Sequence, residues 1–375
     1  MHRTSMFKNF LLVLFSLLLV LLAAEAGLRV TGIGSYSTAE RVLFYSKPSL
    51  LVDEHGVVRY TPDSMHRVVA VYGENIEFDT TQAINNWGFV DNVDYLASDE
   101  NVKDVVFIGD SFTESTGGNS TWVQLLRKNA RQRNVAFHNF GIGGTGILHF
   151  SRLLKHVQPL SGIDELYIVA LSDDFYRPYW YPIADDRGVR FCTKNLSEAD
   201  CIAQEKPIIQ HLEGQESDSQ IIERARSVYA EAAVQAEKPF YASLNLFNIA
   251  CDAYLSVSHG HMLNENCPWL NRTARHLGDP ALQERFRQSL VELESIARDF
   301  DGSVVKVLHL PTKPEIVSGE YNLDLAQVLA GHSVGYVSLL EQCEWSLDMF
   351  YTHDDHPNDM GYQNIANCLA RVLEF

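Results

Sequence analysis

Residues 105–111 of this chain read Val-Val-Phe-Ile-Gly-Asp-Ser, and this stretch decides the predicted fold. Its four leading apolar residues form a continuous run, which is typical of a strand buried on both faces of a parallel sheet. A tight turn at Gly109 and Asp110 then presents Ser111, and residues 122–128 have the apolar spacing of a helix. The stretch therefore predicts a strand, a turn that presents a serine, and a helix.

The same alternation of strand and helix continues to the end of the chain. The other expected elements are strands at 135–140, 166–171 and 304–310, and helices at 147–157, 281–298 and about 360–373. Strands that alternate with helices imply βαβ units. We therefore predict an α/β fold in three layers, with a parallel sheet between two layers of helices.

Two segments differ from this α/β domain, which we assign to residues 103–375. Residues 27–102 contain short β-rich runs separated by turn residues, and they are expected to form an N-terminal lobe. Residues 175–280 break the alternation and hold four of the six cysteines. We interpret them as a disulfide-bearing insertion after the third strand. Ligands bind beyond the carboxyl ends of strands in open parallel sheets, so this insertion is placed to shape a substrate site.

The N-terminus is basic and then strongly apolar. Arg3 and Lys8 precede the apolar run 10–24, which Glu25 ends. This order is typical of a signal peptide or a short signal anchor within residues 1–26, with a buried core helix as the alternative. Cleaved or anchored, the bulk of the protein is expected on the periplasmic or extracellular side. An uncleaved helix would make the inner membrane a partner.

The composition narrows the classes of partner. The chain has 375 residues, 46% of them hydrophobic and 21% charged, as in ordinary globular proteins. Its formal net charge of −18 argues against nucleic acid, because phosphate binding needs a positive surface. An even number of cysteines in an exported chain favours disulfides, with buried free thiols as the alternative. The expected pairing is sequential: Cys192–Cys201, Cys251–Cys267 and Cys343–Cys368.

The residues that suggest chemistry stand at opposite ends of the α/β domain. Ser111 follows the first strand, and Asp354-Asp355-His356 precedes the last helix. A serine hydroxyl becomes a useful nucleophile only when a base lies within hydrogen-bonding reach and an acid orients that base. We predict Ser111, His356 and Asp354 in these roles, with Asp355 pointing elsewhere. The plainer alternative is that Ser111 only caps a helix.

A metal site is a further alternative at the same place. His353 and His356, with the two aspartates between them, carry ligand types that suit a metal. A third anchor near them is not evident from the sequence, since His259 and His261 lie in the insertion. We therefore expect neither a metal nor a cofactor.

These motifs resemble the SGNH (GDSL-type) hydrolase superfamily over about residues 103–375. Ser111 matches the family's serine block, and residues 139–145 look like its glycine block, with Gly144 as the best match. Asp354 and His356, followed by Pro357, Asn358 and Gly361, look like its histidine block. The resemblance implies a flavodoxin-like architecture, a Ser-His-Asp mechanism, and an oxyanion hole built from the serine, the glycine and an asparagine.

Other segments resemble exported, membrane-anchored members that modify O-acetyl groups on exopolysaccharide. They are the N-terminal helix, Asn86-Trp87-Gly88-Phe89 and His309-Leu310-Pro311-Thr312-Lys313.

The chain departs from the family pattern in its third block. The family reads Gly-x-Asn-Asp, whereas residues 171–174 read Leu-Ser-Asp-Asp, so Asp173 stands where the oxyanion-hole asparagine would be. An ionised aspartate accepts hydrogen bonds and would repel an oxyanion. Three outcomes are therefore open. Asp173 is protonated, the N–H groups of Ser111 and Gly144 stabilise the oxyanion without a third donor, or the protein is a feeble catalyst. The histidine block also departs, because His353 occupies the usual aspartate position and Asp354 lies two residues before His356.

We therefore expect an exported serine-nucleophile carboxylic-ester hydrolase that acts on O-acyl groups of envelope or extracellular glycans. Its substrate would be an acylated carbohydrate or a small ester. An O-acetyltransferase would share the acyl-enzyme, and a glycan-binding or assembly protein would retain the fold with a degenerate oxyanion hole. A metal-dependent phosphoesterase is the remaining alternative.

Overall fold

The structure is a computed structural model. It describes residues 2–31, 41–46, 50–52, 57–95, 101–130, 134–156, 163–177, 183–185, 188–190, 209–235, 244, 246–247, 249–250, 280–300 and 304–375. The chain divides into two compact units, residues 1–40 with 227–283 and residues 41–226 with 284–375. From residue 41 onward, the predicted lobe and α/β domain thus share one unit, apart from residues 227–283.

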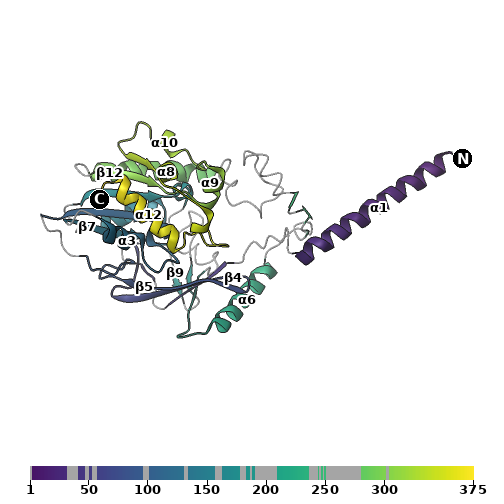
Figure 1. Cartoon of the computed structure of the whole chain (residues 1–375), viewed down its shortest axis with the longest axis horizontal. Coiled ribbons are helices and arrows are strands. Elements are labelled where there is room, and N and C mark those ends of the chain that lie inside the picture. Colours follow the sequence, from purple (N-terminus) through teal and green to yellow (C-terminus); the bar gives the residue numbers. More distant parts are fainter. Residues whose placement is uncertain are drawn as a thin grey trace. The chain divides into compact units, whose positions relative to one another are not determined.

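A five-stranded parallel sheet forms the centre of the second unit (Figure 1). Across the sheet the strands are β13 (Gly335–Ser338), β12 (Val304–His309), β8 (Ile163–Ala170), β6 (Lys103–Gly109) and β7 (Val135–Gly141). All four neighbouring pairs are parallel. Numbered along the chain, this is the 2-1-3-4-5 order of flavodoxin-like folds, so the predicted fold class is confirmed. The short edge strand β13 was not predicted, because its four residues carry no apolar run.

Two helices cover each face of this sheet. They are α3 (Trp122–Asn129) and α12 (Asp359–Val372) on one face, and α4 (Ile147–His156) and α8 (Pro280–Asp299) on the other. Successive side chains of a strand point to opposite faces. Val105 and Phe107 accordingly pack in the core under α3 and α12, whereas Val106 and Ile108 pack in the core under α4 and α8. Burial on both faces explains the continuous apolar run in the sequence.

Short helical turns lie at the ends of the sheet strands and in the loops that follow them. They are α2 (Ser111–Glu114), η1 (Ser172–Phe175), α9 (Lys313–Ser318), α10 (Leu325–Val328), α11 (Leu339–Gln342) and η3 (Leu347–Met349).

A second sheet forms the N-terminal lobe. Its order is β11 (Ile209–His211), β1 (Arg41–Tyr45), β4 (Ser64–Tyr72) and β5 (Asn75–Ile84), and β2 (Leu50–Val52) pairs with β3 (Val58–Tyr60). Strand β11 comes from the segment predicted as an insertion, yet it pairs in parallel with β1. The described remainder of that segment includes a hairpin, β9 (Ile183–Asp185) with β10 (Gly188–Arg190), and α6 (Asp218–Gln235).

The lobe and the α/β sheet share one hydrophobic core. Tyr60, Val68 and Phe89 of the lobe belong to the same buried cluster as Phe140 in β7 and Ile142 after it. This continuity explains why the lobe and the sheet form one compact unit.

Helix α1 (His2–Thr31) belongs to the first unit and contains the apolar N-terminal run. Its side chains from Leu17 to Leu22 are exposed. In the part of the chain that the structure describes, no helix is both long enough and apolar enough to cross a membrane.

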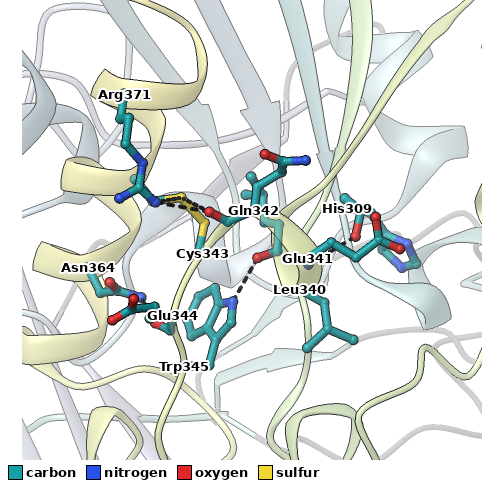
Figure 2. The surroundings of a disulfide bond; sticks show 12 residues. His309, Leu340, Glu341, Gln342, Cys343, Glu344, Trp345, Asn364 and Arg371 are labelled. Atoms are coloured by element: carbon teal, nitrogen blue, oxygen red, sulfur yellow. Dashed lines mark hydrogen bonds between the residues drawn. A yellow bond between two sulfur atoms is a disulfide. The ribbon is translucent and has the colours of Figure 1, made fainter.

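One disulfide of the three predicted lies within the described residues. Cys343, the C-cap of α11, is bonded to Cys368 in α12, with 5.7 Å between their Cα atoms. Figure 2 shows Arg371 beside this bond, donating to the Gln342 carbonyl over 2.9 Å. The disulfide joins the last helix to the loop after β13. The pairs Cys192–Cys201 and Cys251–Cys267 lie outside the described residues.

Candidate active site

The turn that presents Ser111 lies at the carboxyl edge of the sheet, where the strand order reverses. Strands β6 and β8 are neighbours there, with Gly109 opposite Val169. A Cβ at Gly109 would lie 2.7 Å from the Val169 carbonyl oxygen and would also collide with Thr113. The glycine is therefore required by close approach of the two strands. Ligands of open α/β sheets bind at such a topological switch point.

Asp110 holds this turn from within. Its Oδ1 accepts a hydrogen bond from the Phe112 N–H over 2.8 Å and so caps α2. Ser111 is the first residue of α2 rather than its cap, which leaves the Ser111 hydroxyl available to other residues. The plainer interpretation of Ser111 as an N-cap was wrong, because Asp110 has that function.

The structure brings together the three residues predicted for the nucleophile, the base and the acid. Ser111 Oγ lies 2.7 Å from His356 Nε2. On the other side of the ring, Nδ1 is hydrogen bonded to Asp354 Oδ1, which also accepts the His356 backbone N–H over 2.9 Å. Asp354 is completely buried, and His356 is 8% exposed. The imidazole is thus held from one side and faces the serine on the other.

The lobe contributes a residue that the sequence did not suggest. The Tyr72 hydroxyl donates to Asp354 Oδ2 over 2.7 Å, so both oxygens of this carboxylate accept hydrogen bonds. Tyr72 and Asp354 are 282 positions apart, and no local pattern could have connected them.

The loop that carries His356 is fixed at its end by α12. Asn358 caps this helix by accepting from the N–H groups of Met360 (3.0 Å) and Gly361 (3.2 Å). A Cβ at Gly361 would lie 2.7 Å from Pro357 Cβ and would collide with the Met349 carbonyl oxygen. Asn358 and Gly361 of the histidine block are therefore explained by the N-terminus of α12, where Asn358 caps the helix and Gly361 packs closely against Pro357 and Met349.

The neighbouring residues of this loop face elsewhere. His353 Nδ1 lies 2.8 Å from Glu77 Oε2, and hydrogen bonds from His353 lower the pKa of Glu77 although its partial burial raises it. Asp355 is exposed. The two histidines thus contact different carboxylates, and within the described residues no group of three or more histidine, cysteine or acidic side chains is arranged to hold a metal ion.

The glycine block covers the last three residues of β7 and the loop after it. The Ile142 N–H donates to the Gly109 carbonyl over 3.0 Å, which fixes this loop against the serine turn. Gly144 has a φ of 76°, a left-handed conformation that favours glycine. Among the described residues, no acceptor is found for the N–H groups of Gly144 and Ser111. Both N–H groups therefore remain available to a ligand.

Glu114, in the same turn as Ser111, was missed by the sequence analysis. It is completely buried, and its Oε2 accepts from the Gly143 N–H (2.6 Å) and the Tyr60 hydroxyl (2.8 Å). Thr116 donates to Oε1 over 2.9 Å. Burial raises the pKa of Glu114 to about 6 in spite of these hydrogen bonds. The carboxyl group occupies the Gly143 N–H and holds the glycine block against α2.

Asp173 forms an ion pair with Arg177, a contact that was not predicted from the sequence. Its Oδ2 accepts a hydrogen bond from Arg177 Nη2 over 3.0 Å, and its side chain is 45% exposed. Arg177 Nη1 also donates to Asp110 Oδ2 (2.9 Å) and to the Thr145 carbonyl (2.7 Å). The aspartate in the asparagine position is thus paired with a cation.

The adjacent Asp174 lies deeper. Its Oδ1 is 2.8 Å from Arg177 Nη1 as an ion-pair contact without hydrogen-bond geometry, and its Oδ2 accepts the Leu171 N–H over 2.8 Å. Complete burial raises the pKa of Asp174, and Arg177 opposes that shift. Asp174 therefore anchors the turn after β8.

The segment His309 to Lys313 supports two parts of the site at once. His309 Nε2 lies 3.1 Å from Ser172 Oγ, whose hydroxyl donates to the buried Glu315 over 2.5 Å. Burial lowers the pKa of His309 to about 3, so the ring is neutral. Lys313 Nζ donates to the Tyr351 and Thr352 carbonyls, both over 2.8 Å. The segment thus fixes the turn of Asp173 and the loop of His356.

The aromatic run that begins at Phe175 packs inward where it is described. Phe175 is completely buried, and Tyr176 stacks on Phe286 with 5.2 Å between ring centroids. These two rings thus pack within the protein, whereas the aromatic run could also have been read from the sequence as a surface that stacks on sugar rings. Residues 178–182 lie outside the described residues.

Comparisons with known proteins give one family and ten solved protein chains, two of which are distant esterase or acylhydrolase structures. Residues 105–369 match the model of the GDSL-like Lipase/Acylhydrolase family. A two-domain esterase active on acetylated mannans, crystallised with mannopentaose, is 12% identical with a TM-score of 0.33. The match covers 73% of this chain, and the chain spans about half (49%) of that structure's length.

A proposed acylhydrolase from Bacteroides fragilis NCTC 9343 is 14% identical with a TM-score of 0.34, covering 74% of this chain and 90% of the other. No curated protein matches the chain. Similarity this low between structures indicates nothing about the substrate, whereas the family model matches most of the chain and spans the serine, glycine and histidine blocks. The chain belongs to the GDSL-like lipase and acylhydrolase family.

Proposed function

We propose that the protein is a serine-nucleophile carboxylic-ester hydrolase. The observation that carries the proposal is the chain of contacts from Ser111 Oγ to His356 Nε2 (2.7 Å) and from Nδ1 to the buried Asp354. Asp354 accepts a hydrogen bond from the Nδ1–H of His356, which leaves the lone pair of Nε2 facing the serine hydroxyl.

In this proposal Ser111 Oγ attacks the ester carbonyl carbon while His356 Nε2 takes the hydroxyl proton. The tetrahedral intermediate collapses when His356 returns that proton to the departing alcohol, which leaves an acyl group on Ser111. A water molecule, deprotonated by His356, then releases the acid. Asp354 holds the ring and stabilises its positive charge. The N–H groups of Ser111 and Gly144 supply hydrogen bonds to the oxyanion.

For the substrate and the compartment, we propose O-acyl groups on envelope or extracellular glycans. Support for export comes from the resemblance of residues 86–89 and 309–313 to exported, membrane-anchored members, together with the basic and apolar N-terminus. Support for a glycan substrate comes from the spacing of Asp354 and His356, which resembles that of exopolysaccharide-modifying members. The exposed apolar side chains from Leu17 to Leu22 on α1 favour contact with lipid over contact with water. We therefore propose an extracytoplasmic protein that α1 attaches to the inner membrane.

A sugar hydroxyl in place of water would make the same acyl-enzyme an O-acetyltransferase. Asp173, which replaces the asparagine of the family, favours a second candidate, a glycan-binding or assembly protein without activity.

The test is labelling of the purified full-length chain with a fluorophosphonate probe, with p-nitrophenyl acetate turnover measured in parallel. Ser111→Ala is expected to abolish both, and Asp354→Asn is expected to lower turnover by about 10⁴-fold, the cost of the wrong tautomer. Asp355→Asn is the matched control, because this neighbouring carboxylate is exposed and its loss should change neither readout. A folded wild-type protein that neither labels nor turns over ester would refute hydrolysis and favour the binding protein.

A further inference from the structure

Arg177 contacts all three loops that surround the predicted oxyanion hole. Its Nη1 donates to Asp110 before the serine and to the Thr145 carbonyl after the glycine block, and its Nη2 donates to Asp173. These acceptors follow β6, β7 and β8, three adjacent strands of the sheet. No other part of the proposed mechanism uses this cation.

The guanidinium lies close to the nucleophile. Asp110 Oδ2 is 2.9 Å from Arg177 Nη1 and 3.4 Å from Ser111 Oγ, so a single carboxylate oxygen separates the cation from the serine hydroxyl. The Arg177 side chain is 17% exposed. It is therefore held by protein on most sides while retaining an opening to solvent.

Two of the N–H bonds of Arg177 remain uncommitted. A guanidinium has five N–H donors, and the contacts above use those of Nη1 and one of Nη2. Within the described part of the chain, the Nε–H and the second N–H of Nη2 have no acceptor. A cation with free donors beside a nucleophile suits an oxygen that becomes negative during the reaction.

Asp173 orients this group. Its carboxylate forms a charge-assisted hydrogen bond to Nη2, while Asp110 and Thr145 hold Nη1, so the plane of the guanidinium is fixed at both ends. Asp173, Asp174 and Asp110 raise the pKa of Arg177 although its burial opposes this. Arg177 therefore carries its charge at every pH at which the protein is folded.

We propose that Arg177 donates the hydrogen bond to the oxyanion that the asparagine amide donates elsewhere in the family, and that Asp173 is the positioning residue that holds it. This inference depends on the proposed function, because it assigns a donor to the same tetrahedral intermediate. The proposal also explains how an aspartate can stand at this site without repelling the oxyanion. The Asp173 carboxylate pairs with Arg177, and Arg177 in turn donates to the oxyanion.

The experiment compares Arg177→Gln, Arg177→Lys and Asp173→Asn in the full-length chain. Arg177→Gln is expected to lower kcat by about 10²–10³-fold with KM nearly unchanged, as for loss of an oxyanion donor. The kcat values of Arg177→Lys and Asp173→Asn should each lie between those of Arg177→Gln and the wild type. Lysine keeps the charge but lacks the planar guanidinium, and in Asp173→Asn the guanidinium keeps its charge but loses one of its acceptors. Arg287→Gln on α8, 66% exposed, is the control for loss of a cation.

A second measurement separates this role from a structural one. A boronic acid that adds to Ser111 presents a negatively charged tetrahedral oxygen, so its affinity should fall in proportion to kcat/KM across the variants. Thermal unfolding is recorded for each variant. Should Arg177→Gln fail to fold, Asp173→Asn still tests the proposal, because this side chain is 45% exposed and the replacement is isosteric.

The outcomes distinguish this inference from the proposed function. A wild-type protein without fluorophosphonate labelling overturns both. If the wild type is active, three results would overturn only the inference. Arg177→Gln could keep the full kcat, or the affinity for the boronic acid could fail to follow kcat/KM across the variants. Asp173→Asn could also be more active than the wild type. In the last case Asp173 opposes the oxyanion.

Discussion

Replacing Glu114 by glutamine should change how the stability of the protein depends on pH. The carboxyl group is completely buried, and burial raises its pKa from 4.5 to about 6. Between these two values the folded state binds more protons than the unfolded state, so stability falls as pH rises. A shift of this size corresponds to about 2 kcal/mol at 1.36 kcal/mol per pH unit. The stabilisation is fully present below pH 4.5 and lost above pH 6.

Glutamine can preserve the hydrogen bonds while it removes the titration. Its Oε1 can accept from the Gly143 N–H and the Tyr60 hydroxyl, and its amide can donate to the Thr116 hydroxyl oxygen. The free energy of unfolding of Glu114→Gln minus that of the wild type should therefore increase by about 2 kcal/mol between pH 4.5 and pH 7.

The assay is urea unfolding of both proteins at half-unit steps of pH, under conditions where unfolding is reversible. Taking the difference between the two proteins cancels all other titrating groups. Glu344→Gln, at an exposed position, is the matched control for replacing a carboxylate by an amide. A difference for Glu114→Gln that stays constant to within about 0.5 kcal/mol, the range of neutral surface substitutions, would refute a raised pKa at this position.

Three further outcomes are expected. Tyr72→Phe removes the hydrogen bond to Asp354 Oδ2 and should lower kcat about tenfold or more, as for a hydrogen bond to a charged group, with unchanged kcat as the contrary result. Cys343→Ser breaks the bond to Cys368, which closes a separation of 25 residues, and should cost about 2–4 kcal/mol in urea unfolding, with an unchanged free energy of unfolding as the contrary result. Gly109→Ala should prevent soluble expression or lower the melting temperature strongly, because its Cβ would collide with the neighbouring strand.

The order of elements in the α/β domain could be predicted from local patterns. Predicted strands and helices from residue 103 onward agree with the structure within about three residues, because burial on two faces produces continuous apolar runs. Strand β13 was missed, since an edge strand of four residues carries no such run. The pairing of β11 with β1 was also missed, because it joins segments more than 150 positions apart.

The residues proposed for catalysis were identified by motif, and their roles remain predictions. Short motifs in the sequence contain Ser111, Gly144, Asp354 and His356. In the structure Ser111, His356 and Asp354 make the expected mutual contacts, and Gly144 has a positive φ. The consequence of Asp173 could not be predicted. Its effect depends on Arg177, which in the sequence is one residue of an aromatic run.

The family, the alternation of strands and helices, and the choice of Ser111, Asp354 and His356 as candidates follow from residue type and short spacing along the chain. The groups that surround these three residues could be identified only in the folded chain. Tyr72 reaches Asp354 across 282 positions, Tyr60 reaches Glu114 across 54, and Arg177 reaches Asp110 across 67. The physical reason is that hydrogen bonds and ion pairs depend on positions in space, and packing of the lobe and the sheet into one core sets those positions.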